Sequence, residues 1–154
     1  MIFRLRAYRP EDFDALYEID QLCYEPEIAY SRRELRQYMR FPGAECMVAE
    51  SERKLLGFCL AACEGRSGYI ITMDVLQKYR RHGVGSALLQ AIEQQLQSRG
   101  IAEIWLETAT DNDAAIAFWQ KHGYCKRSVR KGYYPGGRDA HSMCKRISGP
   151  AATH

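Results

Sequence analysis

The sequence lacks several features that define whole classes of protein. No apolar run approaches the roughly 20 residues of a membrane-spanning helix, and residues 1–8 alternate apolar and basic side chains where a signal peptide would be continuously apolar. We therefore expect a cytoplasmic protein with no membrane partner. The six cysteines form no CxxC pair, which predicts reduced, mostly buried thiols and no metal site.

The sequence also lacks a large excess of either positive or negative charge. The 22 Lys and Arg residues are nearly balanced by 19 Asp and Glu residues, which leaves a formal net charge of +3. Proteins that bind nucleic acid directly usually carry a far stronger basic balance, so we expect no such partner. The 154 residues suit a single domain, predicted at residues 1–147 and followed by a frayed C-terminal tail at residues 148–154.

Hydrophobic periodicity indicates an α/β chain with a mixed sheet, in the order β-α-α-β-β-β-α-β-α-β-β. Strands are predicted at 3–8, 44–50, 55–64, 67–75, 101–108, about 124–129 and 139–147, and helices begin near 10, 31, 83 and 111. The strands within 44–75 should form an antiparallel meander, whereas the segment 67–108 requires a parallel crossover. Leu22 is expected on the buried face of the first helix. Asp111 is expected to cap the last helix.

One segment carries a ligand-binding pattern: a strand ending in Met73-Asp74-Val75 leads into a basic loop and then a helix. The loop and helix start read Arg80-Arg81-His82-Gly83-Val84-Gly85-Ser86. Two glycines allow close backbone approach, and a helix start offers free N–H groups to a pyrophosphate. No Lys-Ser/Thr follows the glycines, and Leu88 stands where a third dinucleotide-binding glycine would be, which disfavours nucleoside triphosphates and NAD. The alternative is an ordinary turn with a solvated basic face.

The spacing Arg-x-x-Gly-x-Gly at residues 80–85 resembles the acetyl-CoA signature of the GCN5-related N-acetyltransferase (GNAT) family. Residues 112–119 with 122–124 resemble the family's asparagine-alanine-aromatic helix, which ends in Gly-aromatic. Residues 105–107 and 131–140 extend the resemblance to ribosomal-protein N-terminal acetyltransferases of the RimI type. The resemblance implies a GNAT-like acyl-CoA N-acyltransferase fold, acetyl-CoA as cofactor, and a protein or peptide N-terminus, in the narrowest form that of a ribosomal protein, as acceptor.

Acetyl transfer from a thioester to an amine requires a neutral amine, a polarised carbonyl and a departing thiolate. The resemblance assigns the general-base role to Glu107, near the end of the strand 101–108. It assigns the polarising role to the backbone of the strand that ends at Val75. The expected cofactor contacts are Met73, Asp74, Val75, Arg80, Arg81, His82, Gly83, Val84, Gly85, Ser86, Asn112 and Trp119. A surface role for Glu107 stays open.

The group that protonates the thiolate is not fixed by the resemblance. Related enzymes use a tyrosine where this chain has Trp119, whose indole cannot donate a proton near neutral pH. We predict that Tyr134 substitutes, with two alternatives: Tyr134 only shapes the peptide groove, or the thiolate leaves unprotonated. Trp119 itself could pack in the core.

The acceptor amine is expected between two segments. The segment that joins the first two helices lies where the family forms one wall of its acceptor site, and residues 133–134 resemble the substrate-side loop. The predicted acceptor-binding residues are Tyr24, Glu25, Tyr30, Tyr133 and Tyr134. Two other functions stay open: acetylation of a small-molecule amine or a lysine side chain, and a catalytically weak acetyl-CoA-binding sensor module.

Overall fold

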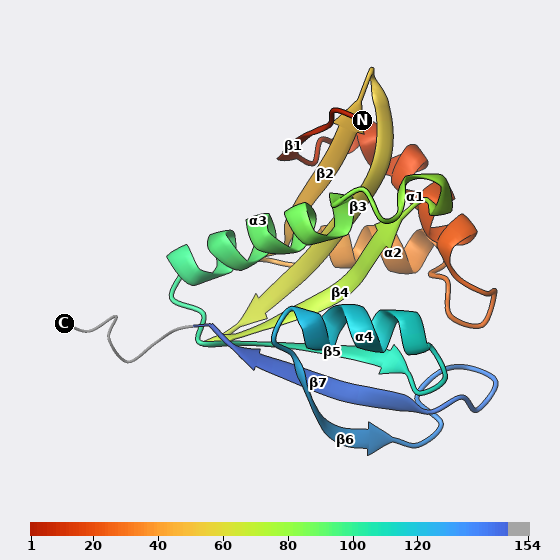
Figure 1. The fold of residues 1–154 in the computed structure, drawn as a ribbon, viewed down its shortest axis with the longest axis vertical. Helices are drawn as coiled ribbons and strands as arrows, with labels where there is room; N and C mark the ends of the chain where they lie inside the picture. The colour runs from red at the N-terminus through yellow and green to blue at the C-terminus, as the bar shows by residue number, and fades with distance from the viewer. Residues whose placement is uncertain (148–154) are drawn as a thin grey trace.

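The computed structural model describes residues 1–147. Figure 1 shows a seven-stranded sheet with helices on both of its faces. The tail predicted at residues 148–154 lies outside the described residues. Within the described part, none of the helices combines the length and the apolarity needed to cross a bilayer.

The order of helices and strands agrees with the prediction, with two added 3₁₀ turns. The elements are β1 (Arg4–Ala7), η1 (Pro10–Asp12), α1 (Phe13–Cys23), α2 (Arg32–Met39), β2 (Glu45–Ser51), β3 (Lys54–Glu64), β4 (Ser67–Val75), η2 (Gln77–Tyr79), α3 (Val84–Ser98), β5 (Glu103–Ala109), α4 (Asp113–Lys121), β6 (Cys125–Arg130) and β7 (Ala140–Arg146). The predicted mixed α/β class is confirmed.

The sheet order is β1-β2-β3-β4-β5-β7-β6. Strands β2 to β4 form an antiparallel meander, as predicted, and β1 pairs antiparallel with β2 at its outer edge. The parallel crossover is also present, but β4 and β5 pair only from Ser67–Glu103 to Tyr69–Trp105. Figure 1 shows the two strands meeting at that end and diverging beyond it. The facing backbone edges of β4 and β5 therefore separate in the middle of the sheet.

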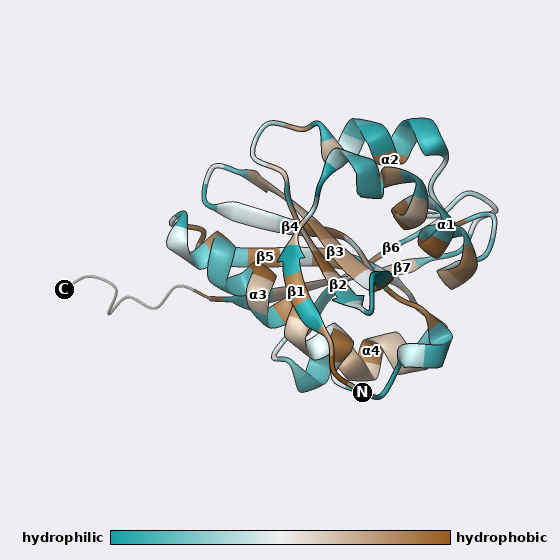
Figure 2. Cartoon of the chain, turned by 90° about the horizontal axis from the view of Figure 1, so that it is seen from above, coloured by the Kyte–Doolittle hydropathy of each residue, from teal (hydrophilic) through white to brown (hydrophobic). Residues whose placement is uncertain are grey.

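The helices form two layers. Viewed from above in Figure 2, α1 and α2 lie on one side of the apolar strands, and α3 and α4 lie on the other. Two buried clusters fill the spaces. The α3–α4 side holds Leu88, Leu89, Ile92, Leu96, Trp119 and Tyr124 with strand residues such as Ile104 and Leu106. The α1–α2 side holds Phe13, Leu16, Ile19, Leu35, Val48, Phe58 and Leu60.

Three sequence predictions are wrong in detail. Leu22 is 76% exposed, because at about 100° per residue it lies about 120° around α1 from the buried Leu16. The cap of α4 is Asn112, whose Oδ1 accepts from the backbone N–H of Ala115 at 3.1 Å, while the Asp111 carboxylate pairs with an arginine elsewhere. Of the cysteines predicted to be mostly buried, Cys59 and Cys144 are buried, three are partly buried, and Cys125 is exposed on the edge strand β6.

Candidate active site

Glu107 lies on β5 beyond the last residue that pairs with β4. Its side chain is 19% exposed, and Ser142 of β7 donates a hydrogen bond to Oε2 at 3.0 Å. The Arg130 guanidinium lies 3.5 Å from the same oxygen. Leu106 and Met143 pack on the α3–α4 side, so their neighbours Glu107 and Ser142 point to the opposite face.

The β6–β7 loop, residues 131–139, brings two tyrosines toward this carboxylate. The rings of Tyr133 and Tyr134 meet edge to face with centroids 4.9 Å apart. Burial raises the pKa of Tyr134 above its usual range, and the neighbouring Tyr133 and the Glu107 charge raise it further. Burial, followed by the Glu107 charge, also raises the pKa of Tyr133. Both phenols are therefore protonated hydrogen-bond donors at neutral pH.

The α1–α2 linker, residues 24–31, covers the edge of β4 that faces the divergence. The Tyr24 hydroxyl donates to the Met73 carbonyl at 3.0 Å, and the Tyr30 hydroxyl donates to the Ile71 carbonyl at 3.2 Å. Because N–H and C=O of one residue point to the same side of a strand, the N–H groups of Met73 and Val75 face this opening too. Asp74, the predicted strand contact between them, has a buried side chain, and its backbone is turned toward its partner Phe58 on β3.

The cofactor loop, residues 80–86, is mostly exposed and has a backbone suited to an anion. Arg81 and Gly83 both have positive φ angles, 67° and 82°. Gly83 is the N-cap of α3 and provides no capping side chain, so the first N–H groups of that helix are available to a phosphate. Arg80 Nε donates to the Val75 carbonyl at 2.8 Å, which ties the loop to the end of β4.

Glycine is needed at positions 83 and 85 of this loop for different structural reasons. A Cβ at Gly83 would meet nothing within 4 Å, whereas a Cβ at Gly85 would lie 3.4 Å from the Phe118 ring of α4. The positive φ explains Gly83, and helix–helix packing explains Gly85. Ser86, another predicted contact, places its Oγ 3.0 Å from His122 Nε2 at the end of α4.

Two further predicted cofactor residues have structural roles in α4. Trp119 is 7% exposed in the core, with its ring centroid 5.1 Å from that of Phe118 and 5.4 Å from that of Tyr124. Asn112 caps the helix. The core packing that the sequence left open for Trp119 is therefore present. A cofactor contact for either residue stays a prediction.

One contact network was not apparent in the sequence. Arg138 of the β6–β7 loop pairs with Glu25 of the α1–α2 linker at 2.7 Å and with Asp111 after β5, also at 2.7 Å. It joins three loops around the opening. Glu25 was predicted to receive the acceptor amine, but its carboxylate is paired here with an arginine far away in the sequence, which it shares with Asp111. Only the opposite charges of these residues could have suggested the contact.

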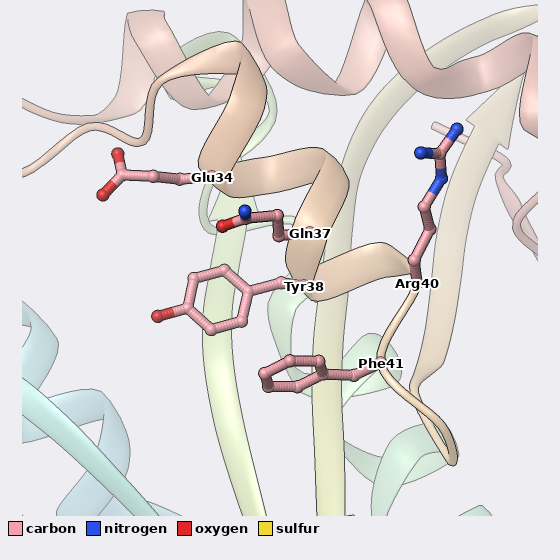
Figure 3. Close-up of a pocket in the computed structure, with 5 residues that line it drawn as sticks. All are labelled: Glu34, Gln37, Tyr38, Arg40 and Phe41. Atoms are coloured by element: carbon pink, nitrogen blue, oxygen red, sulfur yellow. The ribbon is translucent and has the colours of Figure 1, made fainter.

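An aromatic hollow extends the acceptor side along α2. Figure 3 shows Tyr38 and Phe41 lying side by side, with the polar Glu34 and Gln37 next to them. The hollow has a volume of about 500 Å³. Tyr30 of the α1–α2 linker meets Tyr38 edge to face at 5.2 Å, and Tyr38 meets Phe41 at 5.7 Å. A row of rings thus leads from the linker onto the surface.

Comparisons with known proteins agree with this arrangement. The model of the Acetyltransferase (GNAT) family matches residues 13–124. An N-alpha-acetyltransferase of Saccharolobus solfataricus is 30% identical over 158 residues, which cover 93% of this chain and 92% of that protein. The ribosomal protein bS18-alanine N-acetyltransferase of Escherichia coli K12 is 29% identical over 143 residues, covering 89% of this chain and 93% of that protein.

A solved structure shows the same fold. The crystal structure of the ribosomal-protein-S18-alanine N-acetyltransferase from Escherichia coli superposes with a TM-score of 0.89 at 25% identity, over 99% of each chain. The expected GNAT fold is thereby confirmed, as is the resemblance to the RimI type. The chain therefore belongs to the Acetyltransferase (GNAT) family, in the branch that resembles the ribosomal-protein-alanine N-acetyltransferases, and is an N-acetyltransferase whose cofactor is acetyl-CoA.

Proposed function

We propose that this enzyme acetylates the α-amine at the N-terminus of a protein or peptide, with Glu107 as the general base. The observation that carries the proposal is the position of Glu107: it lies where β5 has left β4, beneath the tyrosines of the β6–β7 loop. The names of the two relatives support an α-amine as acceptor. A ribosomal protein is the narrowest form of this proposal, suggested by one of those names.

Acetyl-CoA supplies a thioester carbonyl and a thiolate leaving group. The cofactor loop fits its pyrophosphate, because the N–H groups at the start of α3 have no capping side chain. The N–H groups of Met73 and Val75 can donate to groups placed along the edge of β4, including the reacting carbonyl. These contacts would orient the cofactor through the backbone of β4.

Glu107 has a modest chemical task. An N-terminal amine has a pKa of about 8, so a carboxylate that takes its proton directly or through one water suffices near neutral pH. Ser142 fixes the carboxylate through Oε2, and Arg130 faces the same oxygen. We propose that this anchoring leaves Oε1 to receive the proton from the amine.

Tyr134 suits hydrogen bonding better than proton transfer. Its raised pKa makes transfer to a thiolate, whose conjugate thiol has a pKa of about 8.5, unfavourable. Of the roles predicted for Tyr134, we therefore favour shaping the peptide groove, with its hydroxyl as a donor. The thiolate then leaves without a full proton transfer from this residue.

The alternative acceptors fit the loops less well. A polyamine or lysine-like acceptor brings an extra positive charge, and Arg138, which pairs with both Glu25 and Asp111, already offsets one of their two negative charges. The row of rings from Tyr30 to Phe41 suits a peptide chain better than a small cation. The sensor alternative relied on Trp119, which packs in the core and leaves the Glu107 site intact.

A paired peptide assay tests the acceptor. Each peptide would be offered with a free N-terminus and a blocked lysine, and again with a blocked N-terminus and a free lysine. We expect mass spectrometry to find acetyl groups on the free N-terminus alone. Acetylation of the lysine form at a comparable kcat/KM, or of polyamines in preference to both, would refute the α-amine proposal.

A further inference from the structure

Two buried carboxyl groups meet between α1 and β4, outside the residues assigned to catalysis. Asp20 is 0% exposed and Asp74 is 1% exposed. Asp20 lies about 40° from Leu16 around α1 and therefore faces the sheet. Asp74 is the register partner of Phe58, which packs on the α1–α2 side. Helix and strand thus place the two acids against each other.

Each carboxyl group has one satisfied oxygen and one unsatisfied oxygen. Asp20 Oδ2 accepts from the backbone N–H of Tyr30 at 2.8 Å, and Asp74 Oδ1 accepts from the hydroxyl of Thr72. Asp20 Oδ1 and Asp74 Oδ2 are sealed from solvent and have no donor within residues 1–147. No ion pair joins either acid to a basic group in that range.

The other groups around the pair are neutral titratable side chains. Cys23 and Tyr24 come from the end of α1 and the linker, Tyr30 comes from the linker, and Cys46 and Cys59 come from β2 and β3. Burial raises the pKa of each of them. One cation, Arg80, interacts with Cys23 of this group.

Two buried carboxylates without a cation are doubly unfavourable, through lost hydration and through mutual repulsion. One proton between the two unsatisfied oxygens removes the repulsion and reduces the desolvation cost, because it neutralises one carboxyl group and donates a hydrogen bond to the carboxylate that stays charged. Burial raises the pKa of Asp74 well above its usual range, and the neighbouring Asp20 carboxyl raises it further. Both effects favour retention of the proton to a higher pH than an exposed aspartic acid would allow.

We propose that Asp20 and Asp74 share one proton and act as positioning residues, holding the α1–α2 linker against β4. The Asp20 carboxyl fixes the backbone of Tyr30, and Tyr24 and Tyr30 donate to carbonyls of β4. The pair thereby links the acceptor side of the site to the strand that faces the cofactor. Neither acid touches a reacting atom, since both are fully buried.

The pair makes this link sensitive to alkaline pH. A folded-state pKa above the unfolded value contributes stability that is complete below the unfolded pKa and is lost as pH rises through the folded pKa. Above that point two like charges face each other and drive α1 away from β4. Only the effect on the acceptor rests on the proposed function; the shared proton and the docking of the linker do not.

The test compares the wild type with Asp20→Asn and Asp74→Asn. Each substitution replaces the shared proton with an amide N–H that donates to the remaining carboxylate at every pH. Asp14→Asn, an exposed position on the same helix, is the matched control. Carboxyl-carbon NMR of wild type labelled at aspartate should show one carboxyl group still protonated at neutral pH, and that signal should vanish in each buried variant but persist in the control.

Two further measurements test positioning. In wild type and in Asp14→Asn, raising the pH should lower the hydrogen-exchange protection of residues 24–30 and raise the peptide KM more than it changes kcat. The change should be up to about tenfold per pH unit between the unfolded-state and folded-state pKa values, and should level off above the folded-state pKa. Asp74→Asn should lose both responses. If carboxyl-carbon NMR shows that both acids of the wild type are ionised at neutral pH, the proposal of a shared proton is refuted, even if the variants fail to fold.

If the hydrogen-exchange protection of residues 24–30 changes with pH in Asp74→Asn as it does in the wild type, the positioning role is refuted. Because protonation and exchange need no acceptor, they distinguish a failure of this pair from a failure of the proposed acceptor chemistry. An α-amine that is not a substrate would remove only the KM readout.

Discussion

The Ser142 hydroxyl donates a hydrogen bond to Glu107 Oε2 at 3.0 Å, across a register pair of β5 and β7. The candidate base is thus oriented by the neighbouring strand and not by the loops that surround it. A strand-to-strand contact of this kind holds a side chain more rigidly than a loop contact does. The position of Glu107 relative to the diverging edge of β4 is therefore a property of the sheet.

Replacing Ser142 with alanine should lower kcat for a peptide acceptor by about tenfold, since a hydrogen bond to a charged group is worth roughly 1.5–3 kcal/mol. The KM for acetyl-CoA should hardly change, because Ser142 lies on the acceptor side. Steady-state kinetics with both substrates varied provide the check. A change confined to acetyl-CoA would place Ser142 elsewhere in the site.

The two glycines of the cofactor loop should respond differently to alanine. Gly83→Ala puts a Cβ at a φ of 82°, where only glycine is unstrained, and into open space where the pyrophosphate is proposed. We expect its Kd for acetyl-CoA to rise by about tenfold or more. Gly85→Ala, whose Cβ would lie 3.4 Å from Phe118, should mainly lower Tm. Calorimetric Kd values that are equal for both variants and the wild type would exclude this anion site.

Tyr134→Phe separates the roles of that residue. Since its raised pKa opposes proton transfer to a thiolate, removal of the hydroxyl should raise the peptide KM and leave kcat close to the wild-type value at each pH. A general acid would show the opposite pattern, with a fall in kcat that shrinks at high pH. Kinetics of the variant from acidic to alkaline pH distinguish the two.

Arg138→Ala should alter acceptor preference more than stability. The two ion pairs of Arg138 are largely exposed, and such pairs contribute little to folding. Without the guanidinium, Glu25 and Asp111 present unpaired negative charge around the opening. We expect kcat/KM to increase for lysine-rich acceptors relative to neutral peptides, and added salt to suppress the gain. An unchanged ratio at low salt would show that these loops do not sense acceptor charge.

Local signals made much of the fold predictable. Ser31 and Glu34, at capping-box spacing, form both expected hydrogen bonds, at 3.1 and 2.9 Å. Periodicity located the apolar face of α3, and the crossover rule gave the parallel pairing of β4 and β5. These features depend on residues within a few positions of one another, or on chain topology, so a single sequence contains them.

The errors arose where distant residues compete. Asp111 looks like a helix cap, but Arg138 pairs with its carboxylate, and Asn112 takes the cap. Leu22 follows Ile19 at a helical spacing of three residues, but its position around the helix axis exposes its side chain to solvent. Asp20 was not singled out from the sequence, and its partner Asp74 lies 54 positions further along the chain. Pairings of this kind emerge only when the sheet and helices are assembled.

The most direct measurement is the turnover of an N-terminal peptide by Glu107→Gln, beside the matched control Glu64→Gln at an exposed position of β3. Glutamine keeps the shape and can still accept from Ser142, but it cannot take a proton from the amine. We expect kcat to fall by about 100-fold or more, with the Kd for acetyl-CoA unchanged and the control fully active. Wild-type turnover by Glu107→Gln across the neutral and alkaline range would contradict the assignment of Glu107 as the base.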